Sequence, residues 1–427
     1  MNSSTRKNAL LNTLLICILL FVSPLTGTPQ RTTPRTWIAT WTTSPEPADG
    51  NPNRPLLKID NQTVRERVRV SAGGSQIRLR LSNEYGSSPL TIGPVTVAST
   101  IDFASIKPGS TRAVTFAGSN SITIPAGAPA LSDPINFLVT TGTELTISIY
   151  FPRRVATPTL HSLALKRAVI SQSGDHTRDE KLEGFTTKSS ILVSAVLVPA
   201  QPLQKVIVAF GDSITDGDGS TVDADANWLG HMVRRLAKTP AASKIAVVNQ
   251  GIAGNRLLRD APLEFSSFGN SGVARFDRDA LGISGVTHIL LLEGINDIGF
   301  PGAKVGEKYL ADPADARTVE DLIDGYDQLI ARARARGVKV IGATITPCEG
   351  VNFPGYQTES KEATRQAINK WIRTSGMFDG VIDFDAVLRD PDHPSRLLAK
   401  FASGDHLHPN DVGYKAMSDA IDLTLFK

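Results

Sequence analysis

The sequence of 427 residues contains only two cysteines, Cys17 and Cys348. Cys17 lies in an N-terminal stretch that we expect to be removed, so the mature chain would keep one cysteine and form no intrachain disulfide. Cys348 has no histidine near it in the sequence, which does not favour a thiol nucleophile. The stability of the fold must therefore come from its apolar cores.

The sequence also lacks an excess of charge of one sign, because its 45 Lys and Arg residues nearly balance its 42 Asp and Glu residues, and the net charge is +3. Removal of Arg6 and Lys7 with the leader lowers this charge to +1. Such a balance argues against a nucleic-acid partner and against binding to an acidic membrane surface.

Long hydrophobic runs are absent too, since the apolar core Leu14–Val22 is too short to span a bilayer. Arg6 and Lys7 precede this core, and Pro24 and small residues near Gly27 follow it, as in a secretory signal peptide. We expect residues 1–27 to be a cleaved signal peptide and the mature protein to be secreted or periplasmic, without stable membrane insertion. A retained anchor is the alternative, and no pattern indicates an oligomeric state.

Residues 28–200 have the alternating pattern of half-buried antiparallel strands. Ile77, Leu79 and Leu81, for example, alternate with Arg78 and Arg80. Further strands are predicted at Leu90–Val97, Ile122–Ile124, Leu145–Phe151 and Ile191–Val198. Many short strands without a long helix predict an all-β sandwich of jelly-roll type.

The pattern changes after Pro199–Pro202, where we place a domain boundary, and strands alternate with helices over residues 201–427. The predicted strands are Val206–Phe210, Ile245–Val248, Ile289–Leu292, Val338–Ile345 and Val381–Phe384. The predicted helices are Trp228–Leu236, Val319–Arg336, Glu362–Arg373 and Val412–Leu425. This alternation predicts a three-layer α/β domain with a five-stranded parallel sheet, doubly wound like flavodoxin.

Ser213 follows the apolar strand Val206–Phe210 in Gly211-Asp212-Ser213, so it is a candidate nucleophile at the carboxyl edge of the sheet. A serine nucleophile needs a base and a group that orients the base. His408 and Asp405 are three residues apart in a loop before the last helix, a spacing that places both side chains on one face of a helical turn. A polar surface loop is the alternative interpretation. His406 would point elsewhere, and we expect structural roles for His161, His176, His231 and His288 and a solvent position for His393.

Two further strand-end motifs supply candidate donors for an oxyanion. Gly254 follows the second strand and offers a backbone N–H without an obstructing side chain, although a Gly-x-x-Gly pair is equally compatible with a tight turn. Asn296 follows the third strand and offers its side-chain amide, with a turn cap as the alternative. Together with the N–H of Ser213 they would form an oxyanion hole, while Asp212 and Asp297 tie loops together.

The four motifs occur in order after strands that share one sheet edge, and together they resemble the GDSL, or SGNH, serine hydrolases. The matching blocks are Phe210–Thr215, Asn249–Gly254, Gly294–Asp297 and Asp405–Pro409, so the resemblance covers about residues 201–427. Ile214 replaces the leucine of the family's nickname, a conservative change. Thr215 replaces the final glycine of the Gly-x-Ser-x-Gly elbow of α/β-hydrolases, which separates the chain from that superfamily.

The resemblance implies a serine esterase or acylhydrolase that works through an acyl-enzyme and needs no metal or cofactor. The first half more weakly resembles the β-rich part of secreted acylhydrolases of polysaccharide-degrading bacteria, in Trp37–Trp41, Asn61–Val70 and Arg78–Gly86. This similarity suggests a small-molecule or polysaccharide ester as substrate, with deacetylation of carbohydrate as one case.

The loops Ile298–Pro313 and Glu349–Thr358 should wall the pocket. Phe300, Phe353 and Tyr356 on them are predicted substrate contacts, although such rings can equally pack as loop cores.

Three alternatives stay open. Asp216, Asp218, Asp223 and Asp225 could bind a metal, but Asn227 stands where a calcium loop needs a bidentate glutamate, and a solvated acidic loop is simpler. The chain could also be a polysaccharide-binding protein with an inactive hydrolase domain. Finally, an acyltransferase would use the same groups and pass the acyl group to an alcohol.

Overall fold

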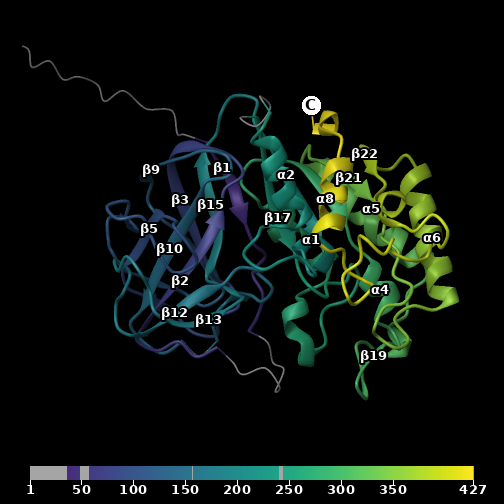
Figure 1. Ribbon diagram of the computed structural model, residues 1–427, viewed down its shortest axis with the longest axis horizontal. Coiled ribbons are helices and arrows are strands. Elements are labelled where there is room, and N and C mark those ends of the chain that lie inside the picture. The colour runs from purple at the N-terminus through teal and green to yellow at the C-terminus, as the bar shows by residue number, and fades with distance from the viewer. Residues whose placement is uncertain (1–35, 49–56, 156, 240–243, 427) are drawn as a thin grey trace, which may run out of the picture. The chain divides into compact units, whose positions relative to one another are not determined.

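The second half of the chain is organised by a parallel sheet in the computed structural model of the protein (Figure 1). Among the described residues this sheet has five strands in the order β17-β16-β18-β21-β22. The strands are β16 (Lys205–Gly211), β17 (Ile245–Gly251), β18 (Val286–Leu292), β21 (Lys339–Ala343) and β22 (Gly380–Ile382). The chain starts in the interior of the sheet and winds outward in both directions, which confirms the predicted flavodoxin-like α/β fold.

The structure describes residues 36–48, 57–155, 157–239 and 244–426. The predicted signal peptide, residues 1–27, lies outside these ranges. Within them, no helix is long and apolar enough to cross a bilayer.

Helices cover the parallel sheet (Figure 1). They are α1 (Ser213–Asp216), α2 (Trp228–Leu236), α3 (Gly272–Phe276), α4 (Ile295–Gly299), α5 (Val319–Ala335), α6 (Glu359–Thr374), α7 (Phe384–Leu388) and α8 (Asp411–Ala420). Helix α2 contacts α8, whereas α5 contacts both α3 and α6. Right-handed crossovers put these two groups on opposite faces of the sheet, which gives three layers.

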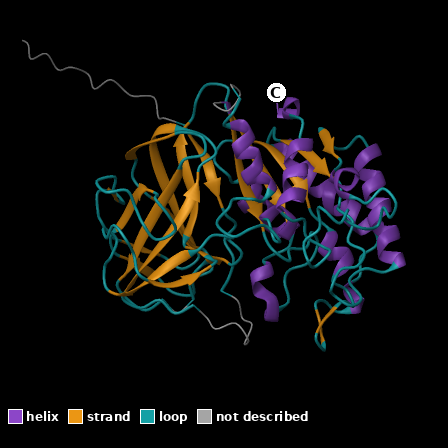
Figure 2. Cartoon of the chain, viewed as in Figure 1, coloured by secondary structure: helices purple, strands orange, loops and turns teal. Residues whose placement is uncertain are grey.

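The first half forms antiparallel sheets within the described part of the chain (Figure 2). One sheet contains β1 (Trp37–Thr42), β15 (Val193–Pro199), β3 (Gly74–Asn83), β8 (Ala128–Leu131) and β9 (Ile135–Val139). The other contains β13 (Gly184–Thr187), β12 (Ala168–Ser173), β2 (Gln62–Arg69), β10 (Glu144–Phe151), β5 (Val95–Ser99) and β6 (Arg112–Val114). Buried side chains of both sheets, such as Leu79 and Ile147, belong to one apolar core, as expected of an all-β region.

Short two-stranded pairs complete the described strands. These are β4 (Leu90–Ile92) with β7 (Ile122–Ile124), β11 (Leu160–His161) with β14 (Ser190–Ile191), and β19 (Lys304–Val305) with β20 (Lys308–Tyr309).

Three predicted elements are each divided in the structure. The run Leu90–Val97 is two strands, because Gly93 and Pro94 interrupt it. The run Ile191–Val198 is broken at Leu192, whose φ of 72° is incompatible with a continuous strand. The final helix ends at Ala420, because Ile421 is extended, and Leu423–Phe426 forms a separate 3₁₀ turn.

The antiparallel region is joined directly to the edge of the parallel sheet. The Val247 N–H of β17 donates to Ser71 Oγ at 3.0 Å, and Thr42 Oγ1 donates to the Asn249 carbonyl at 2.8 Å. Thr36–Lys427 is one compact unit, and a single apolar core runs through both regions. The domain boundary at residues 200 and 201 stays a prediction.

Candidate active site

Ser213 stands at the junction of β16 and α1. The strand ends at Gly211, Asp212 is the N-cap of α1, and its carboxylate accepts from the Ile214 N–H at 2.9 Å. A Cβ at Gly211 would lie 2.2 Å from the Leu292 carbonyl oxygen and 2.3 Å from Thr215 Oγ1, so only glycine fits this turn. The turn places Ser213 at the carboxyl edge of the sheet with 5% of its surface exposed.

The structure brings Ser213, His408 and Asp405 together in one chain of hydrogen bonds. His408 Nε2 lies 2.8 Å from Ser213 Oγ, and His408 Nδ1 lies 2.6 Å from Asp405 Oδ2. The Asp405 carboxylate also accepts from Ser403 Oγ and from the N–H groups of Leu407 and His408. These bonds hold the carboxylate in place, so one imidazole nitrogen faces the aspartate and the other faces the serine.

The charges around His408 favour its protonated form. Burial alone lowers the pKa of His408, but the hydrogen bond that it donates to Asp405 and the negative charges of Asp218, Asp405 and Asp212 outweigh burial and raise it. Burial also opposes the charge of Asp405, yet the His408 hydrogen bond and charge hold the pKa of Asp405 well below its usual range. The arrangement therefore stabilises an imidazolium, the form His408 takes after accepting a proton from a serine.

Gly254 lies directly after β17 in a left-handed turn with φ of 79°. The N–H of the preceding residue, Ala253, donates to Asp216 Oδ2 at 3.2 Å, which ties this turn to the end of α1. Asn296 lies on α4 and is 2% exposed, and its Nδ2 donates to the Asn255 carbonyl at 2.9 Å. Loops after β16, β17 and β18 thus carry Ser213, Gly254 and Asn296 to the same edge of the sheet, as the sequence motifs predict.

Two of the three predicted substrate-contact rings are buried instead of lining an open site. Tyr356 is 1% exposed, and its hydroxyl donates to Asn296 Oδ1 at 2.8 Å. Phe300 is 5% exposed and packs edge-on against Tyr356 with ring centroids 5.9 Å apart. The expectation of direct substrate contact is therefore corrected for both, because Tyr356 orients the amide of Asn296 and Phe300 supports Tyr356. Phe353 is half-buried, and its role as a substrate contact stays a prediction.

Arg275 on α3 is a central residue that the sequence analysis missed. Its guanidinium donates to the carbonyls of Gly211 and Gln250, each at 2.8 Å, and to Asn255 Oδ1 at 2.8 Å. It also lies 4.0 Å from the centroid of the Phe210 ring and 3.5 Å from Glu293 Oε1. One fully buried cation thus joins the ends of β16 and β17 to the turn that carries Gly254. Its only sequence signal is an arginine between apolar residues.

Glu293, which pairs with this cation, interacts with two further buried carboxyl groups, Asp212 and Asp297. Burial raises the pKa of Asp212 to about 7 and that of Asp297 to about 6, and burial together with the charge of Asp212 raises the pKa of Glu293 well above its usual range. Asp297 accepts from the N–H groups of Leu257 and Leu258, so it ties loops together as expected.

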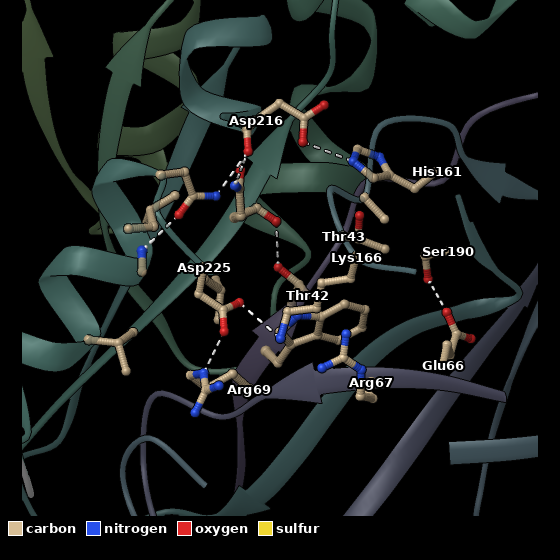
Figure 3. Close-up of a pocket in the computed structure, with 18 of the residues that line it drawn as sticks. Thr42, Thr43, Glu66, Arg67, Arg69, His161, Lys166, Ser190, Asp216 and Asp225 are labelled. Atoms are coloured by element: carbon tan, nitrogen blue, oxygen red, sulfur yellow. Dashed lines mark hydrogen bonds and ion pairs between the residues drawn. The ribbon is translucent and has the colours of Figure 1, made fainter. Parts of the chain in front are cut away.

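Two of the acidic residues after Ser213, Asp223 and Asp225, form ion pairs instead of lying free in a solvated loop. Asp223 pairs with Arg67 and Arg167, and Asp225 pairs with Arg69 and Lys166, so both carboxylates bind cations of the antiparallel region. Figure 3 shows the Asp225 pairs at a cavity of about 120 Å³.

Asp216 lies at the same cavity and bonds His161 instead (Figure 3). His161 Nε2 is 2.9 Å from Asp216 Oδ1, and His161 Nδ1 is 2.9 Å from Glu46 Oε1. Within the described residues these three side chains are close enough to hold a metal ion, with ligand atoms within 4.8 Å of one another. Burial opposes the charge of His161, but the two carboxylates outweigh it and raise its pKa well above the usual value. The imidazolium offers no lone pair, so an ion triad accounts for the cluster better than a metal site does.

Asp218 is a second acidic residue beside His408, on the side of Nε2. Its Oδ2 lies 3.8 Å from His408 Nε2, and its side chain is 41% exposed. The carboxylate thus faces the open side of the imidazole.

Cys348 and the other histidines take no part in this arrangement. Cys348 is buried, and burial raises the pKa of its thiol to about 12, so it is a poor nucleophile. His231 lies on α2 and His288 on β18, as expected of structural residues, whereas His176 forms a half-exposed pair with Asp179.

The part of the chain that carries these residues matches a known protein family. The sequence model of the GDSL-like lipase/acylhydrolase family matches residues 209–416. A search of curated proteins found no match.

Solved structures similar to the chain include an aryl esterase of M. smegmatis, a GDSL-like lipase of Bacteroides thetaiotaomicron and an acetyl xylan esterase. The aryl esterase is 16% identical with a TM-score of 0.39, and the alignment covers 51% of this chain and 95% of the esterase. The lipase is 18% identical with a TM-score of 0.38, and the alignment covers 53% of this chain and 91% of the lipase. The acetyl xylan esterase is 18% identical with a TM-score of 0.35, and the alignment covers 50% of this chain and 96% of that esterase.

Proposed function

Because residues 209–416 belong to the GDSL-like lipase/acylhydrolase family and form a carboxylic ester hydrolase, we propose that Ser213, His408 and Asp405 are its catalytic triad. His408 Nε2 accepts the Ser213 proton while Ser213 Oγ attacks the ester carbonyl. Asp405 keeps the imidazole oriented and stabilises the imidazolium. The tetrahedral intermediate expels the alcohol, which takes the proton from His408, and leaves an acyl-enzyme. Water, deprotonated by His408, then releases the acid and restores Ser213.

The oxyanion of the tetrahedral intermediate is held by the N–H groups of Ser213 and Gly254 and by the Asn296 amide. The Asn296 amide has a defined orientation, because Tyr356 donates to its oxygen and thereby leaves the NH₂ group to act as a donor. Removing one donor of this kind costs about 10²–10³ in rate.

One observation carries the proposal: His408 Nε2 lies 2.8 Å from Ser213 Oγ while Nδ1 lies 2.6 Å from Asp405. The test is hydrolysis of a chromogenic acetyl ester by Ser213→Ala, which should lose turnover by about 10⁴-fold or more. Ser121→Ala, an exposed serine before β7, is the control and should retain full activity. Unchanged turnover in Ser213→Ala would refute the triad, and the binding-protein alternative would then gain support from polysaccharide binding without esterase activity.

We further propose that the enzyme is secreted and that the alcohol part of its ester is rich in hydroxyl groups, as in a carbohydrate. Asp218 supports this proposal, because the leaving alcohol must approach His408 Nε2, and the half-exposed Asp218 carboxylate beside that atom can accept from neighbouring hydroxyls. Acid release from acylated xylan or pectin, compared with simple alkyl esters of the same acid, tests the alcohol. Transfer of the acyl group to added glycerol would instead identify an acyltransferase.

A further inference from the structure

Phe265, Phe268 and Phe300 form a row of rings that begins at the proposed oxyanion hole. Phe268 stacks on Phe265 with centroids 5.3 Å apart and an interplanar angle of 9°, and it lies 5.6 Å from Phe300 on its other side. Phe300 is buried, whereas Phe268 and Phe265 are half-buried. We call these three rings the aromatic row.

The aromatic row touches Gly254 itself. A Cβ built on Gly254 would lie 2.4 Å from Cγ and Cδ1 of Phe268, so the ring packs against the glycine backbone. Asn255 holds this contact in place, because its Nδ2 donates to the carbonyls of Phe268 and Asn270 at 2.7 and 2.8 Å. Arg275 in turn donates to Asn255 Oδ1. The position of the ring is thus set by the same residues that set the oxyanion turn.

The direction of the ester at this site follows from the proton that the leaving group needs. The alcohol oxygen receives its proton from His408 Nε2, so the alcohol lies on the side of His408 and Asp218. The carbonyl oxygen points to the donors at Ser213, Gly254 and Asn296. The acyl group is the remaining substituent, and the half-buried rings beside Gly254 offer it an apolar surface.

We propose, on the basis of the ester-hydrolase function above, that Phe265 and Phe268 form the acyl-binding wall and that the preferred acyl group is an apolar chain longer than acetyl. Each methylene that such a wall removes from water improves binding by roughly threefold to fourfold. The gain continues along the row, and an acetyl group is too short to use most of this surface.

The test compares kcat/KM for p-nitrophenyl acetate, butyrate, hexanoate and octanoate in the full-length enzyme. The wild type should prefer hexanoate to acetate by about 10²-fold, because hexanoate has four more methylenes and each contributes threefold to fourfold. Phe265→Ala should lose about tenfold on hexanoate and thereby lower the hexanoate-to-acetate ratio, because an acetyl group is too short to use most of the row. Phe265→Leu, which keeps an apolar side chain, should recover most of the preference.

Phe268→Ala is the second variant, and it should reduce the hexanoate-to-acetate ratio in the same direction. Phe185→Ala, on the 50% exposed ring of β13, is the matched control and should leave every ratio unchanged. The proposal would be overturned if Phe265→Ala lowered kcat/KM equally for all four esters. It would also be overturned if the loss in kcat/KM depended on the alcohol part of the ester and not on the length of the acyl chain. Ser213→Ala tests the hydrolase function separately, because it affects every ester alike.

Discussion

At the scale of single residues, the chemistry of the site depends on the hydrogen-bond partners of each polar side chain. Ser213, His408 and Asp405 form a linear chain of bonds, and two residues outside it, Asp218 and Tyr356, contact His408 and Asn296 respectively. Asp218 acts on the charge of His408, and Tyr356 acts on the orientation of Asn296. Their removal should therefore have different kinetic consequences.

Asp218→Asn should shift the acid limb of the pH–rate profile to lower pH. His408 must be neutral to accept the Ser213 proton, so activity falls as the pH drops through its raised pKa. Removing the Asp218 charge lowers that pKa, while Asp405 and Asp212 still face the ring. The measurement is kcat/KM for a neutral ester from about pH 5 to about pH 9, a range that brackets the usual histidine pKa of about 6.5.

Asp419→Asn is the control for this shift, because Asp419 forms an exposed pair with Lys415 on α8. An acid limb that stays in place in Asp218→Asn would show that the Asp218 carboxylate does not influence His408.

Tyr356→Phe should lower kcat by roughly tenfold with little change in KM, since the Asn296 amide loses its orientation but not its donors. The loss should be larger for kcat than for KM because the oxyanion exists only in the transition state and the intermediate. Tyr150→Phe also removes a hydroxyl that donates to an asparagine, Asn61, but in the antiparallel region, and should leave both constants unchanged. A matching rise in KM would instead indicate a substrate contact for Tyr356.

At the scale of elements, the ends of β16 and β17 are held together from behind by Arg275 on α3. Arg275→Met should destabilise the protein by about 3–5 kcal/mol, because it leaves buried carbonyls and the Glu293 carboxyl without their cation. Urea unfolding measures the loss. Arg332→Met on α5 also removes a cation that packs on Phe276, yet Arg332 pairs with the exposed Asp277, so this control should cost about 1 kcal/mol or less.

The element order was predictable because local patterns decide it. The apolar runs that became β16, β17 and β18 are bounded by turn residues, and their side chains are buried on both faces. The errors lie where one residue interrupts a run, as at Leu192 or Ile421, because apolar periodicity carries no information on φ and ψ.

The covering of the edge strand of the parallel sheet is a second feature that local sequence patterns did not predict. Ser71 and Thr42 bond the backbone of β17 and thereby cover an edge strand that would otherwise expose unpaired groups. The alternating strands of residues 28–200 predict a sandwich, but nothing in them indicates that this sandwich also caps the hydrolase sheet.

At the scale of the whole molecule, His161 joins the antiparallel region to the catalytic turn. It bonds Glu46 on one side and Asp216 on the other, and Asp216 holds the Ala253 N–H next to Gly254. The antiparallel region thus supports the turn that carries Gly254, part of the proposed site.

His161→Phe should destabilise the protein by about 3–5 kcal/mol, because two buried carboxylates lose their cation. The pKa of His161 is raised in the folded state, so its contribution is fully present below its unfolded pKa of about 6.5 and is lost as the pH rises through the folded value. The difference between wild type and variant should therefore be largest at acidic pH in urea unfolding.

His176→Phe is the matched control for His161. Its partner Asp179 is exposed, so this pair should contribute about 1 kcal/mol or less. Equal losses in the two variants would show that burial of the Glu46, His161 and Asp216 triad adds nothing to stability.

The sequence by itself determined the parallel sheet and the positions of Ser213, Gly254, Asn296, Asp405 and His408. It could do so because parallel strands place their carboxyl ends on one edge, and because Asp405 and His408 are close neighbours in the chain. Only the tertiary structure decided the roles of Arg275, Tyr356 and His161. Each of them acts on a partner 20 or more residues away, such as Asn255, Asn296 or Asp216. Whether such a side chain meets its partner depends on how separate elements pack, and no local periodicity encodes that packing.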